Sequence, residues 1–134
     1  MIYSNLIKGV TSDHDLIELA KKLNIHVDDI ITIDEATRRV KHGTYIILLR
    51  ADDGVGHWVA THNGEYFDST GVGAPTKLGD LPYNQFQYQS TYDQFCGIWC
   101  ILWLYSKQKN KPDLLRGFHN LDIDFVWDNI SPIK

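Results

Sequence analysis

Thiol chemistry is indicated by four residues that occur in the order His57, Asp68, Gln89 and Cys96. Cys96 is one of two cysteines, and it stands where a polar run, YQSTYDQF, changes into the apolar stretch GIWCILWLY. At the start of a buried helix, unpaired N–H groups and the helix dipole both favour a thiolate. Cys96 is therefore a candidate nucleophile, whereas Cys100, one turn further along, is typical of a small buried core residue.

His57 and Asp68 lie on two alternating runs, HWVAT and EYFDST, that flank Asn63 and Gly64. Asn-Gly between such runs is the strongest short hairpin signal. A two-residue turn there pairs Val59 with Asp68, so His57 and Asp68 become diagonal neighbours on one face, with backbones roughly 7 Å apart. For an arbitrary hairpin histidine, exposure on the sheet surface is the commoner outcome. Because a candidate nucleophile elsewhere in the chain needs a base, this spacing instead predicts a histidine oriented by a carboxylate.

Acyl transfer also requires hydrogen-bond donors aimed at the oxyanion. Gln89 lies in the polar loop seven residues before Cys96, and its side-chain amide is a candidate donor beside the Cys96 backbone N–H. Gln89 alone is a weak signal, because the same loop holds several glutamines. Gly97 is expected to let another backbone approach closely, and Tyr92 and Phe95 either line a substrate cleft or simply pack.

The elements that must position these residues follow from local patterns. A cap-like Ser12 or Asp13, followed by apolar residues at helical spacing, predicts an amphipathic helix. The apolar run TYIILLRA suits a strand that is covered on both faces. The expected elements are helices at 13–24 and 34–42, a strand at 44–51, the hairpin at 57–70, a long loop at 71–94, a buried helix at 97–108 and a final helix at 124–130. This order predicts an α+β domain in which a small, mostly antiparallel sheet packs on a central buried helix.

Composition excludes several classes of protein. A chain of 134 residues with 43% hydrophobic and 22% charged residues is expected to form one ordered domain, residues 1–134. The net charge of -4 disfavours nonspecific nucleic-acid binding. No signal-peptide pattern or membrane-length apolar run is present, and two cysteines four residues apart cannot staple a secreted fold. We therefore expect an intracellular protein and not a secreted one.

The motifs "HW", "YFDSTG" and "YQSTYDQFCG" together resemble the adenovirus-protease-like and ubiquitin-like-protein-protease superfamily of cysteine peptidases. The resemblance covers residues 43–106, about half of the chain. The seven-residue spacing from Gln89 to Cys96, with Ser90 directly after Gln89, is closer to the adenoviral branch. Papain-like enzymes place the cysteine first, so the order here implies a papain-like core in circularly permuted order.

The resemblance implies a role for each matching residue. Cys96 would be the nucleophile, His57 the general base and acid, Asp68 the residue that orients His57, and Gln89 with the Cys96 N–H the oxyanion hole. Trp58, on the strand face opposite His57, would shape the wall of the site. The chain is shorter than the family's usual catalytic domains, and eleven residues separate His57 from Asp68 where many relatives have a longer hairpin. These departures put in doubt the surfaces that dock ubiquitin-like substrates or activators.

The resemblance thus predicts a cysteine endopeptidase that cleaves a polypeptide after small, Gly-like residues, as a viral or mobile-element protease processing polyprotein or capsid precursors. It implies a location in a host cytoplasm or nucleus, or in a virion. An isopeptidase that removes ubiquitin or SUMO is the alternative. A third reading is a non-catalytic interaction domain in which His57, His62, Cys96 and Cys100 bind zinc, but hairpin parity places the two histidines on opposite faces. We therefore expect no metal and no cofactor. An activator peptide is known in the adenoviral branch, and nothing in this sequence indicates one.

Overall fold

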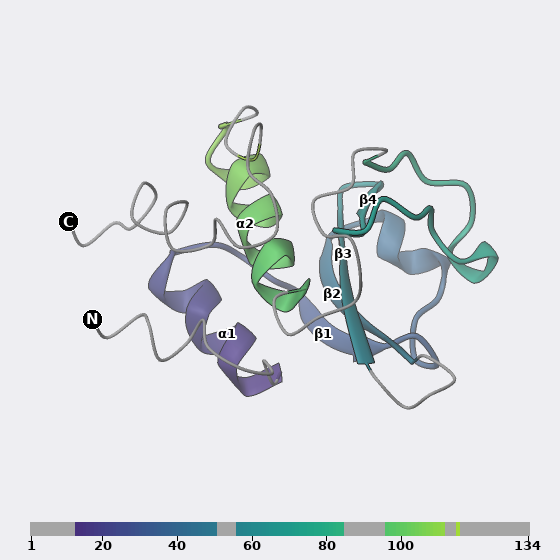
Figure 1. The fold of residues 1–134 in the computed structure, drawn as a ribbon, viewed down its shortest axis with the longest axis horizontal. Coiled ribbons are helices and arrows are strands. Elements are labelled where there is room, and N and C mark those ends of the chain that lie inside the picture. Colours follow the sequence, from purple (N-terminus) through teal and green to yellow (C-terminus); the bar gives the residue numbers. More distant parts are fainter. Residues whose placement is uncertain (1–12, 51–55, 85–95, 112–114, 116–134) are drawn as a thin grey trace.

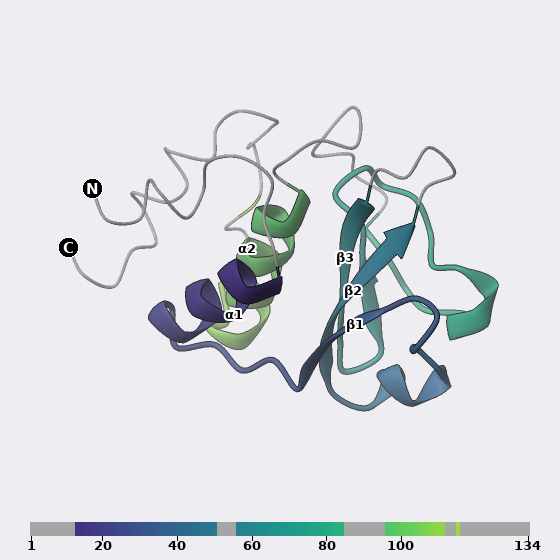
Figure 2. The same cartoon turned by 90° about the horizontal axis from the view of Figure 1, so that it is seen from below.

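Two helices cover one side of a β-sheet, and two short 3-10 segments lie on its other side (Figures 1 and 2). The computed structural model describes residues 13–50, 56–84, 96–111 and 115. In this part of the chain the helices are α1 (Asp13–Lys22) and α2 (Cys96–Gln108), and the 3-10 segments are η2 (Arg38–Lys41) and η3 (Thr76–Leu78). The layered arrangement matches the expected α+β class.

The described sheet has four strands in sequence order, which are β1 (Asp29–Thr32), β2 (Thr44–Arg50), β3 (Gly56–His62) and β4 (Glu65–Phe67). β1 runs parallel to β2, while the β2–β3 and β3–β4 pairs are antiparallel. The sheet is therefore mostly antiparallel, as predicted. β1 was not predicted, because its four residues, DIIT, include only two apolar side chains and carry too weak a pattern.

A tight turn at Asn63 and Gly64 sets the register of β3 against β4. Both residues have positive φ, 48° and 89°, as a type I′ turn requires. Ala60 pairs with Phe67, which is the register that the two-residue turn predicts. β4 ends at Phe67, so Asp68 is the first residue beyond the strand.

The sheet is covered on both faces, as the sequence of β2 predicted. Ile46 and Ile47 are consecutive residues with opposite orientations, and neither is exposed. Ile46 belongs to the core shared with α1 and α2, and Ile47 belongs to the core beneath η2 and η3. All residues of α2 from 97 to 106 are buried, which confirms the predicted central helix.

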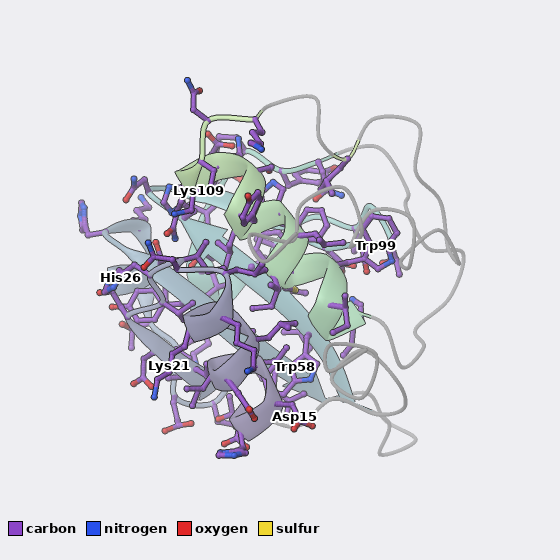
Figure 3. All side chains as sticks on the ribbon, turned by 90° about the vertical axis from the view of Figure 1, so that its left-hand side faces the viewer. Asp15, Lys21, His26, Trp58, Trp99 and Lys109 are labelled. Carbon is purple, nitrogen blue, oxygen red and sulfur yellow. The ribbon has the colours of Figure 1, made fainter. Side chains whose placement is uncertain are left out.

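α2 is also attached to β4 and to the linker after α1. Phe67 stacks on Trp103 with ring centroids 5.2 Å apart, which fixes the end of β4 just before Asp68. At the C-terminal end of α2, Gln108 bonds both backbone groups of His26, with its Oε1 2.7 Å from the N–H nitrogen and its Nε2 2.6 Å from the carbonyl oxygen. Lys109 Nζ donates to the Asn24 carbonyl at 2.8 Å. Figure 3 labels His26 and Lys109 on the side where α2 ends.

The helix predicted at 34–42 is wrong in most of its length. The chain there forms a turn after β1 and then only the four-residue η2. Glu35 Oε1 accepts the Thr32 N–H at 3.0 Å and its hydroxyl at 3.1 Å. Because this side chain closes the turn locally, and because so short a segment nucleates a helix poorly, a regular α-helix does not form. The helix predicted at 124–130 and the last residue of the strand predicted at 44–51 lie outside the described residues.

An aspartate anchors the start of β2. Asp28 Oδ2 accepts the Thr44 N–H at 2.8 Å, and Oδ1 lies 2.6 Å from His26 Nε2. The Thr44 N–H, followed by His26, holds the pKa of Asp28 below its ordinary value. The folded protein therefore binds a proton at Asp28 less readily than the unfolded chain does.

This difference predicts a pH-dependent contribution to stability. The contribution of Asp28 is complete above the unfolded pKa of about 4 and is lost as the pH falls through the lowered folded pKa. We expect Asp28→Asn to reduce the unfolding free energy at pH 7 by no more than about 1 kcal/mol, because the carboxylate is 39% exposed. Urea unfolding should show the full difference at pH 7 and pH 5, and a smaller one at pH 3. An equal loss at all three pH values, or the same profile for the exposed Asp34→Asn, would contradict the assignment.

Candidate active site

His57 and Asp68 form a buried hydrogen-bonded pair. His57 is the second residue of β3, and Asp68 follows β4 directly. His57 Nε2 lies 2.7 Å from Asp68 Oδ1, and each side chain is only 1% exposed. The contact predicted from the hairpin spacing is therefore present. The pair is buried, whereas a histidine on a hairpin is more commonly exposed at the sheet surface.

The pair determines which ring nitrogen of His57 can act as a base. A carboxylate only accepts hydrogen bonds, so Nε2 carries the hydrogen in the neutral ring. Nδ1, which is also buried, then carries the lone pair of the neutral ring. This tautomer suits general-base chemistry at Nδ1, with Asp68 fixing the orientation of the ring.

Asp68 Oδ1 receives two further hydrogen bonds from Thr70. The Thr70 N–H lies at 2.8 Å and its hydroxyl at 2.7 Å. The Gly71 N–H closes the same turn by donating to the Asp68 carbonyl at 2.8 Å. We did not single out Thr70 from the sequence. The signal was present in D-S-T-G, because Asp often bonds the backbone two residues on and Gly follows such turns.

Asn84 holds the backbone of Asp68 by both of its amide atoms. Its Oδ1 accepts the Asp68 N–H at 3.0 Å, and its Nδ2 donates to the Asp68 carbonyl at 2.6 Å. No sequence pattern marks this contact, because the two residues are sixteen positions apart and the pairing depends on the path of the loop predicted at 71–94. In its described part this loop contains η3 and a single parallel bridge between Tyr66 and Tyr83.

The first turn of α2 packs on the strand that carries His57. A Cβ atom placed on Gly97 would lie 3.0 Å from Trp58 Cδ1 and 3.1 Å from Leu16 Cδ2. Figure 3 shows Trp58 beside α1 and the start of α2. The absence of a side chain at Gly97 therefore allows the side chains of Trp58 and Leu16 to approach closely. We had expected a backbone segment to make this approach. Trp58 joins the helix-side core and His57 faces the other way, so the predicted opposite orientations are present.

The remaining predicted site residues are placed only in part. Cys96 is the first residue of α2, as the sequence indicated, but its side chain lies outside the described part of the structure. Gln89, Tyr92 and Phe95 also lie outside the described residues. Their roles, and the catalytic roles of His57 and Asp68, stay predictions. Cys100 is a fully buried residue of the helix-side core, as expected.

His62 is separate from the site. Its Nδ1 lies 2.7 Å from Thr44 Oγ1. Burial, followed by the positive charge of Lys107, lowers the pKa of His62, and Glu65 opposes this shift. Across the described ranges, no cluster of three or more His, Cys, Asp or Glu side chains is arranged to hold a metal ion. Nor does any helix in these ranges have the length and apolar character needed to cross a bilayer.

Comparison with known proteins identifies a fold relative but no sequence family. No family model matches the chain, and no curated protein matches it. Among solved structures, the fold is similar to that of the ASFV pS273R protease, with a TM-score of 0.56 and 12% sequence identity. The match covers 94% of this chain and 68% of that one. At this identity the similarity shows a shared fold.

The close packing at Gly97 can be tested by a double-mutant cycle. We expect Gly97→Ala to lower the unfolding free energy by about 1 kcal/mol, because the overpacking against Trp58 exceeds the gain in helix propensity. In a Trp58→Leu background the added methyl gains room, so the penalty should shrink. Urea unfolding of the four proteins gives the coupling energy. Equal effects of Gly97→Ala in both backgrounds would show that Trp58 does not limit the approach.

Proposed function

We propose that this protein is a cysteine peptidase in which Cys96 is the nucleophile and His57 its base. The observation that carries the proposal is the 2.7 Å hydrogen bond between His57 and Asp68, both 1% exposed. A buried pair of this kind fixes the tautomer and direction of an imidazole, which is what nucleophilic catalysis requires of its base. The helix that begins at Cys96 packs on Trp58, the residue next to His57.

Two independent observations support the proposal. The motifs around His57, Asp68 and Cys96 resemble cysteine peptidases of the adenovirus-protease-like and ubiquitin-like-protein-protease superfamily. A solved structure with a similar fold is that of a protein described as a protease, and the match extends over 94% of this chain. The motif resemblance and the fold similarity therefore point to the same class of enzyme.

The proposed reaction is acyl transfer through a thioester. His57 Nδ1 accepts the proton of Cys96, and the thiolate adds to the scissile carbonyl carbon to form a C–S bond. Protonated His57 then gives this proton to the leaving amine as the C–N bond breaks. Water then adds to the thioester carbon as His57 takes its proton. The C–S bond breaks to release the acid, and protonated His57 returns the proton to the Cys96 sulfur. Asp68 keeps the ring oriented and stabilises the imidazolium that forms in each half of the reaction.

For the substrate, we propose a polypeptide cleaved after small residues such as glycine, within a viral or mobile-element precursor. This specificity follows from the resemblance, as do the roles of Gln89 and the Cys96 N–H as oxyanion donors and of Trp58 as a wall of the site. An isopeptidase acting on ubiquitin-like conjugates would use the same residues. A ubiquitin-tail electrophile distinguishes the two, because a precursor endopeptidase would not react with it.

The activated thiol can be measured without knowing the substrate. We expect iodoacetamide to alkylate Cys96 well below pH 8.5, the ordinary pKa of a thiol being about 8.5. His57→Ala should move this reactivity to higher pH, because the imidazolium partner is lost. Measured in a Cys100→Ala background, the mass gain of the protein reports Cys96 alone. Unchanged alkylation in His57→Ala would contradict the proposed pair.

Peptide cleavage tests the complete reaction. With a peptide library that places Gly, Ala or a larger residue before the scissile bond, we expect Cys96→Ala to abolish turnover. His57→Ala should lower kcat/KM by about 10²- to 10⁴-fold, the usual contribution of a general base. Cys100→Ala should retain activity, because that side chain is buried in the core. Activity that persists in Cys96→Ala would overturn the assignment of the nucleophile.

A further inference from the structure

The chain just before Asn84 pairs with β4, but at Asn84 the side chain makes the bond that the main chain would make in a strand. The Tyr66 N–H donates to the Pro82 carbonyl at 2.8 Å, and Tyr66 and Tyr83 form a parallel bridge. In a parallel ladder the bonding residues of a strand are two apart, so the next residue to bond would be Asp68, to the main-chain carbonyl of residue 84. The side-chain carbonyl of Asn84 accepts that bond instead.

A single amide side chain thus replaces two steps of a ladder. Asn84 Oδ1 takes the place of the main-chain acceptor, and Nδ2 supplies the donor that a later residue would otherwise provide to the Asp68 carbonyl. Asp68 needs this support because the antiparallel pairing of β4 with β3 ends one residue earlier, at Phe67.

The two ends of Asp68 are therefore fixed by different residues. Asn84 fixes its backbone, and Thr70 fixes Oδ1 through the N–H and the hydroxyl. With both ends fixed, Oδ1 meets His57 Nε2 at 2.7 Å. Removal of the Asn84 amide would take away the acceptor of the Asp68 N–H and leave the Asp68 carbonyl with the Gly71 N–H, so the carboxylate would shift relative to the imidazole ring.

We propose that Asn84 is a positioning residue that aligns Asp68 with His57, an inference that rests on the function proposed above. It does not touch the reacting atoms and acts only through Asp68. Misplacement of a catalytic group by about 1 Å can reduce a rate by about 10²-fold. We therefore expect Asn84→Ala to lower kcat by about 10- to 100-fold with little change in KM.

Proton NMR tests the alignment directly, because it detects the proton shared between His57 Nε2 and Asp68 Oδ1. The buried Nε2 proton of His57, bonded to a carboxylate, should give a low-field resonance, assigned by its absence in His57→Gln. In Asn84→Ala we expect it to move upfield and to exchange faster with water. Asn84→Asp keeps an acceptor for the Asp68 N–H but places an oxygen against the Asp68 carbonyl, so the same direction of change is expected.

Glu35→Ala is the matched control. Glu35 also supports an edge strand by accepting two hydrogen bonds from one residue, Thr32, but it does so at the opposite edge of the sheet. It should reduce stability without changing the His57 resonance or kcat. An unchanged resonance in folded Asn84→Ala, or an equal change in Glu35→Ala, would overturn the proposal. Unfolding of both Asn84 variants would do so too, because it would assign Asn84 a purely structural role.

The NMR result separates this proposal from the proposed function. If the wild type cleaves no peptide while its His57 resonance still depends on Asn84, the positioning role stands and the peptidase assignment fails. If the wild type cleaves peptides and Asn84→Ala does so equally well, the peptidase assignment stands and the positioning role fails.

Discussion

The register of the β3–β4 hairpin is the constraint on which the site depends. Asn63 and Gly64 occupy a turn that requires positive φ at both positions, and this geometry allows one pairing of the flanking strands. A shift by one residue would exchange the two faces of β4, so that Asp68 would face the helices and leave His57 buried without its carboxylate. The polar pair and the packing of the sheet are thus set by the same two residues.

Alternation along β3 gives two neighbouring residues different tasks. His57 faces the core beneath η2 and η3 and bonds Asp68, while Trp58 faces the helices and receives the first turn of α2 at Gly97. The candidate base and the start of the helix that carries the candidate nucleophile are therefore positioned by adjacent residues of one strand. A site built on regular elements in this way is held more precisely than one built on loops.

The parts of the fold that local chemistry determines could be predicted from the sequence. The hairpin register follows from Asn63 and Gly64, and the burial of α2 follows from its nearly uniform apolar composition. β1 could not be predicted, because an edge strand of four residues is defined by its partner β2 and hardly by its own pattern. The contact of Asn84 with the Asp68 backbone could not be predicted either, because it depends on where a loop passes β4.

The bonds between Gln108 and His26 have a consequence for how the molecule opens. α1 is held to α2 at one end by Leu16 against Gly97 and at the other by the linker that Gln108 and Lys109 bond. Local opening of α1 must therefore disrupt α2 as well, so the amides of both helices belong to one cooperative unit in hydrogen exchange. Because the first turn of α2 packs on Leu16 of α1, the position of the backbone at Cys96 depends on both helices.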